Sequence, residues 1–333
     1  MFYKLITGNR FVTASIIFLL ATGLWMPEFL SPGIAFRNEA DSSMPLSSLL
    51  SQLFENAPIV SKLMAFVLML IEAFMLVRIN ARFVLVQQRT FLPALFFVIV
   101  ASHSPELMQW NPVLPATIFM ILALELIFHS HQEDPNSYRF FEAGLMLGLG
   151  SLFYAPLAYM LGFIWIANMV QRPFYWREYV LPVLGLSVPF MVTFALLFLG
   201  DGSIPRFIAG IESIFAIQFN IPHYPWILWV FWIYLGFLIL LSSVFLVKVF
   251  QFRKIYVRNY FMVLFWLFIS GSLVFLLLSG FNAGFSYVIG ISISFILTNY
   301  FVNARKSIVN KSLLYLLLTY VVFLALANLM GKL

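Results

Sequence analysis

Long apolar segments recur along the whole chain and decide what it can fold into. Residues 226–247, "WILWVFWIYLGFLILLSSVFLV", hold no charged side chain. A helix of about 20 such residues crosses the roughly 30 Å apolar core of a bilayer. Comparable segments follow one another, and 62% of all residues are hydrophobic, more than a soluble domain is expected to carry. We therefore expect an all-α fold, a polytopic bundle of transmembrane helices.

The apolar pattern predicts eleven spans and no loop long enough to fold separately, so residues 1–333 are expected to form a single integral membrane domain. The spans are residues 11–30, 59–77, 91–103, 113–128, 140–154, 156–170, 179–199, 226–247, 259–279, 285–302 and 312–330. Those between residues 91 and 170 are short for a bilayer, and prolines lie at or near their ends. We expect these helices to be broken or tilted.

The basic residues indicate an orientation. With the N-terminus in the cytoplasm, fifteen of the nineteen Lys and Arg residues lie on the cytoplasmic side. The four left outside are Arg37, Lys62, Arg206 and Lys332. Because short cytoplasmic loops are enriched in Lys and Arg, this asymmetry predicts a cytoplasmic N-terminus, an outside C-terminus and a place in the cytoplasmic (inner) membrane. The basic residues are spread along the chain, so nucleic acid is not an expected partner.

The lack of cysteine excludes some kinds of chemistry, and the first apolar segment can be compared with a signal peptide. The sequence contains no cysteine, which excludes disulfides, thiolate nucleophiles and Cys-ligated metals. Lys4 and Arg10 precede the first apolar core, as in a signal peptide, but no A-x-A-like cleavage site follows. We therefore expect the first span to remain as a membrane anchor.

Two outward loops, residues 31–58 and 200–225, are larger than the others. Within the first loop, apolar residues follow helical spacing from position 46 to 54, and serines occupy the other side. The apolar residues are Leu46, Leu49, Leu50, Leu53 and Phe54. Such a pattern predicts an amphipathic helix that lies flat in the outer membrane interface.

Two carboxylates, Glu39 and Asp41, stand just before this helix, next to Arg37. One of the carboxylates could act as a general base toward an acceptor hydroxyl. Together they could instead bind a divalent cation that neutralises a lipid phosphate. The alternative is a solvated loop with no chemical role. The flat helix favours a functional role, because it would hold the loop at head-group depth.

Other outward residues could complete such a site. His103 and Glu106 lie three residues apart in "SHSPELMQW" and could supply a second acid or a metal ligand facing the first loop. The alternative is an ordinary polar turn. Arg206 is a candidate partner for a lipid phosphate, although a lone interfacial Arg can also be an unspecific head-group contact.

A few acidic residues fall within or beside the predicted spans. Glu72 and Glu125 are both expected near the cytoplasmic ends of their helices, with Glu125 able to pair with His129 one turn later. Glu142 can pair with Arg139 in the same way. No acid is then expected at mid-membrane depth, which argues against proton-coupled transport.

Two further motifs favour structure over chemistry. The stretch "HSHQED" at residues 129–134 carries metal-binding side chains but has no second ligand cluster, so we do not expect a metal there. Glycines at positions 144, 148 and 150 favour close helix packing rather than a phosphate-binding loop.

Over residues 1–200, the chain resembles the GT-C architecture of membrane glycosyltransferases that use polyprenyl-phosphate sugars. The resemblance rests on "RNEADSSMPLSSLLSQLF" (37–54), an acidic outward loop followed by a flat helix, and on residues 140–190, a Gly-rich helix pair followed by a basic turn. It implies that Asp41 or Glu39 is the catalytic base and Glu106 the second outward acid. The chain also resembles small bacterial multi-pass families with no assigned activity.

The first hypothesis is therefore a glycosyltransferase that uses a lipid-linked sugar on the outer face of the membrane. The second is a non-catalytic membrane subunit or scaffold, whose partners would be other membrane proteins. The third is a lipid or solute transporter. Membrane lipids are expected partners in all three cases.

Overall fold

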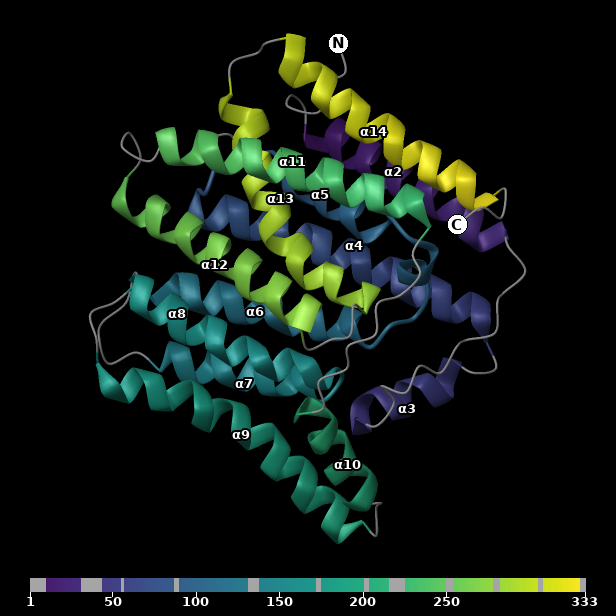
Figure 1. Cartoon of the computed structure of the whole chain (residues 1–333). Helices are drawn as coiled ribbons and strands as arrows, with labels where there is room; N and C mark the ends of the chain where they lie inside the picture. Colours follow the sequence, from purple (N-terminus) through teal and green to yellow (C-terminus); the bar gives the residue numbers. More distant parts are fainter. Residues whose placement is uncertain are drawn as a thin grey trace.

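The residues that the computed structural model describes lie mainly in helices (Figure 1). It describes residues 10–30, 44–54, 57–86, 90–130, 138–171, 175–200, 204–215, 225–249, 254–277, 282–304 and 308–329. Within these ranges no residue is in a β-strand, in agreement with the predicted all-α fold.

Eight of the described helices are long and apolar enough to cross a membrane. They are α2 (Arg10–Leu30), α4 (Pro58–Phe83), α6 (Val113–Ser130), α9 (Trp176–Leu199), α11 (Trp226–Val249), α12 (Ile255–Leu277), α13 (Ser286–Asn303) and α14 (Ile308–Leu329). The predicted polytopic membrane architecture is thereby confirmed. The count of eleven spans remains a prediction.

Shorter helices fill the gaps between the long ones. They are α3 (Pro45–Phe54), α5 (Leu92–Ala101), α7 (Arg139–Ser151), α8 (Leu161–Gln171) and α10 (Ile204–Phe215), with 3₁₀ turns η1 (Pro105–Met108), η2 (Ala155–Met160) and η4 (Ala283–Phe285). The three remaining predicted spans coincide with α5, α7 and η2–α8. Every residue of α5 is buried, so this helix lies inside the bundle and does not face lipid.

The centre of the bundle is α13, which packs against α5, α11 and α12. This helix is buried almost throughout although it carries several hydroxyl groups. Ser292 and Ser294 donate to the carbonyls of Ile289 and Ile291, at 2.8 and 2.7 Å. Hydroxyls satisfied by their own helix can be buried without an unpaired polar group. The outlying α9 and α14 instead expose apolar side chains, as expected of lipid-facing helices.

Glycines allow α7 and α9 to approach closely. A Cβ atom added to Gly144 would overlap the backbone of Pro182, and one added to Gly185 would overlap the carbonyl oxygen of Phe141. Gly150 is likewise closed in by the side chain of Leu157. The packing role predicted for Gly144 and Gly150 is confirmed.

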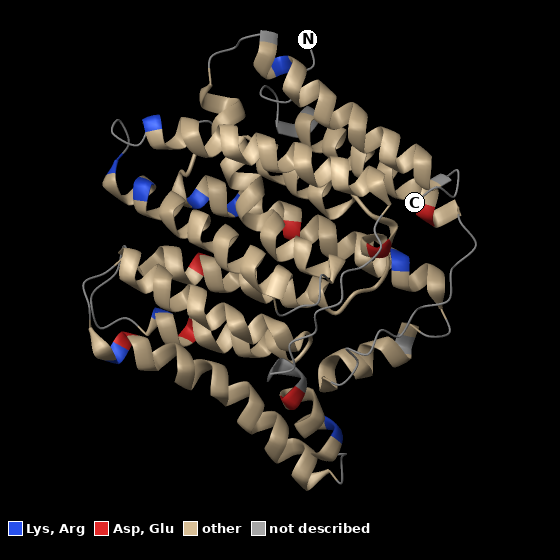
Figure 2. Ribbon diagram, in the orientation of Figure 1, with Lys and Arg blue, Asp and Glu red and all other residues tan. Residues whose placement is uncertain are grey.

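Charged residues are distributed unequally between the two ends of the bundle (Figure 2). One end, hereafter the basic end, holds most of the described Lys and Arg residues: Arg78, Arg82, Arg139, Arg177, Lys248, Lys254, Arg258 and Lys311. Lys62 and Arg206 lie at the opposite end. The asymmetry on which the predicted orientation rests is therefore present between the two ends of the folded bundle.

Candidate functional site

The end opposite the basic end contains a buried polar segment, residues 102–112, between α5 and α6. Ser102, His103 and Ser104 are each at most 3% exposed. Buried backbone that leaves a helix must find other hydrogen-bond partners, and non-helical backbone at membrane depth is tolerated only inside protein or along a cavity. The contacts of the 102–112 segment therefore show what holds this end together.

Three helices bind the segment directly. The indole Nε1 of Trp25, on α2, donates to Ser102 Oγ at 2.8 Å. The hydroxyl of Tyr287, on α13, donates to the carbonyl of Leu107 at 2.7 Å. The backbone N–H of Trp110 donates to Ser61 Oγ on α4 at 3.3 Å. The segment thus joins the first spans to the central helix.

A buried ion pair lies beside the segment. Lys62 Nζ is 3.0 Å from Glu28 Oε1, both side chains are 5% exposed, and the same ammonium donates to the Glu28 carbonyl at 2.6 Å. Gln109 and Asn328 contribute amides at 3.3 and 3.5 Å from the Glu28 carboxylate. Burying charge is costly unless the partners neutralise each other and satisfy their remaining hydrogen bonds, so this cluster ties α2, α4 and α14 together.

Sequence reasoning missed this pair, although a signal for it was present. Glu28 is near the end of the first span and Lys62 is near the start of the second. Because consecutive spans run in opposite directions, charges at such positions meet at the same end of a bundle.

His103 lies in an aromatic pocket of α11. Its ring stacks on Phe231 at 5.1 Å with an interplanar angle of 8°, and meets Trp232 edge-on at 4.9 Å. Nδ1–H donates to the Val100 carbonyl at 2.7 Å. Burial lowers the pKa of His103 to about 4, so the imidazole is neutral near pH 7 and its Nε2 acts as an acceptor.

Glu106 and Arg206 are both exposed. Glu106 is in the first turn of η1, so the 102–112 segment buries His103 and presents Glu106 to the surroundings. Arg206 is on α10, a helix within the second outward loop that the sequence did not predict. The buried Phe207 holds α10 against α9, with its ring 6.2 Å from that of Phe190.

The helix predicted after the acidic loop is confirmed as α3. It turns Ser47 and Ser51 toward the protein and leaves Leu49 60% exposed. Its Phe54 ring packs against Trp110 at 4.8 Å, which docks α3 on the 102–112 segment. Serine hydroxyls that bond to their own helix can be buried in this way, as Ser47 does with the Met44 carbonyl at 2.9 Å. The predicted candidates Arg37, Glu39 and Asp41 lie outside the described residues.

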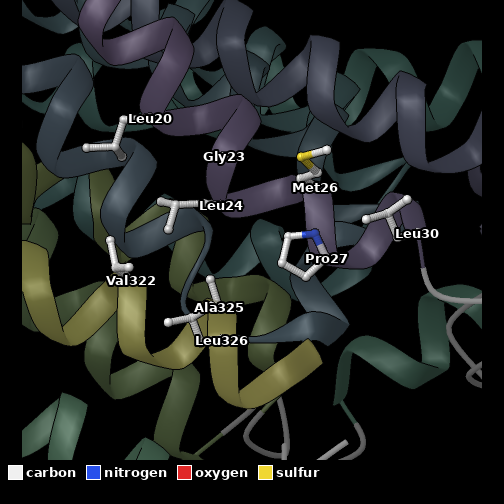
Figure 3. Close-up of a pocket in the computed structure, with 9 residues that line it drawn as sticks. All are labelled: Leu20, Gly23, Leu24, Met26, Pro27, Leu30, Val322, Ala325 and Leu326. Carbon is white, nitrogen blue, oxygen red and sulfur yellow. The ribbon is translucent and has the colours of Figure 1, made fainter. Parts of the chain in front are cut away.

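An apolar groove runs between α2 and α14 (Figure 3). It has a volume of about 320 Å³. Its lining is Leu20, Gly23, Leu24, Met26, Pro27, Leu30, Val322, Ala325 and Leu326. Glu28 lies between the lining residues Pro27 and Leu30, and Asn328 is two residues after Leu326, so the groove passes close to the buried ion pair. A groove without polar side chains suits a hydrocarbon chain.

The acid pairs predicted near the basic end differ in outcome. Glu125 accepts from both Arg78 and Arg82, with distances between 2.7 and 2.9 Å. These arginines of α4, rather than the expected His129, bind the carboxylate in the structure. The predicted pair of Arg139 and Glu142 is confirmed at 2.9 Å.

The prediction that Glu72 lies near the end of its helix is wrong. α4 continues to Phe83, because Arg78 and Arg82 extend the helix beyond the apolar stretch and bind Glu125. Glu72 therefore lies deep within α4, between Lys62 and Arg78, and is 0% exposed. The argument against proton coupling from the absence of such an acid is removed.

Within the described part of the chain, no three His, Cys, Asp or Glu side chains group closely enough to hold a metal ion. No protein-family model, curated protein or solved structure matches the chain. The fold and the apolar helices alone define the class, a multi-pass membrane protein.

Proposed function

We propose that this protein transfers a sugar from a polyprenyl-phosphate carrier at the end of the bundle opposite the basic end. In this proposal that end faces the outside of the cytoplasmic membrane and the N-terminus is cytoplasmic. The observation that carries the proposal is the docking of α3, through Phe54 and Trp110, on the segment that holds His103 and Glu106.

The docking of α3 supports a site for the acidic loop near Glu106. Asp41 is three residues before the fully buried Met44. An extended chain spans at most about 3.6 Å per residue, so Asp41 is within about 11 Å of Met44 along the chain. In this proposal the carboxylates of the loop act at the same end of the molecule as Glu106.

The chemistry requires a base near lipid head groups. Asp41 takes the proton of an acceptor hydroxyl, the hydroxyl oxygen bonds to the anomeric carbon of the sugar, and the bond from that carbon to the phosphate oxygen breaks. The phosphate leaves on its lipid carrier. Glu39 binds the acceptor or a divalent cation, and Arg37 and Arg206 contact the phosphate.

Two features suit a lipid-borne substrate. The exposed Leu49 on α3, opposite the buried serines, is what an interfacial helix needs on its lipid side. The groove between α2 and α14 offers an apolar surface for the polyprenyl chain.

The test is sugar incorporation from polyprenyl-phosphate donors by the purified protein. Asp41→Asn keeps the side-chain size but removes the base, so transfer should fall by about two to four orders of magnitude. Glu39→Gln tests the second acid. Glu212→Gln makes the same change on an exposed residue of α10 and should leave the rate unchanged. Equal activity in all variants would remove the assigned base. No transfer with any donor would favour a non-catalytic subunit.

A further inference from the structure

A buried carboxyl group inside the bundle has no role in the proposed transfer. Glu72 is 0% exposed, and neither carboxyl oxygen has a hydrogen-bond partner among the described residues. The nearest basic residues along α4 are engaged elsewhere, since Lys62 binds Glu28 and Arg78 binds Glu125. An ionised carboxylate without a partner is very costly in such a place.

In the part of the chain that the structure describes, the helices around α4 supply no compensating cation. α4 packs against α2, α3, α5, α6 and η1. Apart from the first residue of α2, the described parts of these elements carry the following titratable groups: Glu28, Glu125, His129 and Glu106. Glu28 is paired with Lys62, Glu125 and His129 lie toward the basic end, and Glu106 is exposed.

We propose that Glu72 is a proton-binding site within the membrane and holds its proton near neutral pH. Because neither carboxyl oxygen has a hydrogen-bond partner among the described residues and the side chain is 0% exposed, this buried position favours the neutral carboxyl group.

The protonated state can be tested by covalent labelling. Dicyclohexylcarbodiimide reacts with protonated carboxyl groups: the carboxyl oxygen bonds to the central carbon of the reagent, and the acid proton passes to a reagent nitrogen. The matched control in the same protein is Glu125, which two arginines keep ionised. At pH 7 we expect modification of Glu72 to exceed that of Glu125 by on the order of tenfold or more, measured by mass spectrometry of the peptides. An unmodified Glu72, or equal modification of both, would overturn the proposal.

The labelling experiment does not measure sugar transfer, so a failed transferase assay and a failed proton site are distinguishable.

Discussion

Several ionisable side chains are buried at the end of the bundle opposite the basic end. Glu28 and Lys62 neutralise each other inside the protein, whereas His103 is kept neutral by its aromatic surroundings. Both arrangements make this end sensitive to changes that leave a charge without its partner. They lead to two predictions, one on mutation and one on pH.

Replacing Lys62 by Met keeps the length of the side chain but leaves the Glu28 carboxylate buried without its cation. We expect the free energy of unfolding to fall by about 3–5 kcal/mol, the usual cost of breaking a buried pair. Adding Glu28→Gln removes the remaining charge and should restore much of the loss. Denaturant unfolding in detergent measures both variants, and a single variant as stable as the wild type would contradict the role of the pair.

The lowered pKa of His103 makes stability depend on pH. In the unfolded chain the His103 imidazole has a pKa of about 6.5, so it binds a proton below that pH. In the folded protein it binds a proton only below about pH 4. The free energy of unfolding should therefore fall as the pH drops through this window, by up to about 3 kcal/mol, and level off below it. His103→Asn can still donate to the Val100 carbonyl but does not titrate. Its stability measured against pH should lack this component, and an unchanged profile would exclude His103 as the source.

Among the described helices, α7 and α9 pack closely, and this packing requires glycine at the points of contact. Gly144 and Gly185 face backbone atoms of the opposite helix rather than flexible side chains, so a larger residue cannot be accommodated by a side-chain shift. The pair holds the outlying α9, which is otherwise mostly exposed, against the bundle.

Gly144→Ala should destabilise the protein by about 1–3 kcal/mol, because the added methyl group forces the two backbones apart. Gly162 on α8 provides a matched control, since a Cβ atom there meets nothing within 4 Å. Gly162→Ala should be neutral or stabilising by up to about 1 kcal/mol through helix propensity. Thermal unfolding of both variants in one detergent measures the difference, and equal effects would show that α7 and α9 tolerate separation.

At the scale of the whole molecule, hydrophobic spacing predicted the helices well. Each predicted span coincides with helix in the structure, and α3 occupies the expected positions. Spacing failed where interactions between distant segments decide the outcome. The depth of Glu72 depends on Arg78 and Arg82 finding Glu125 on α6, which no local pattern encodes.

The orientation of the whole bundle provides the last prediction. Most described Lys and Arg residues lie at one end, and the positive-inside rule assigns that end to the cytoplasm. In this cysteine-free chain, Glu212→Cys on the exposed side of α10 should react with a membrane-impermeant thiol reagent in intact cells. Lys254→Cys, exposed at the basic end before α12, should react only after the membrane is permeabilised. The reverse pattern would place α3, Glu106 and the proposed transfer site in the cytoplasm, where the base would face cytoplasmic rather than external acceptors.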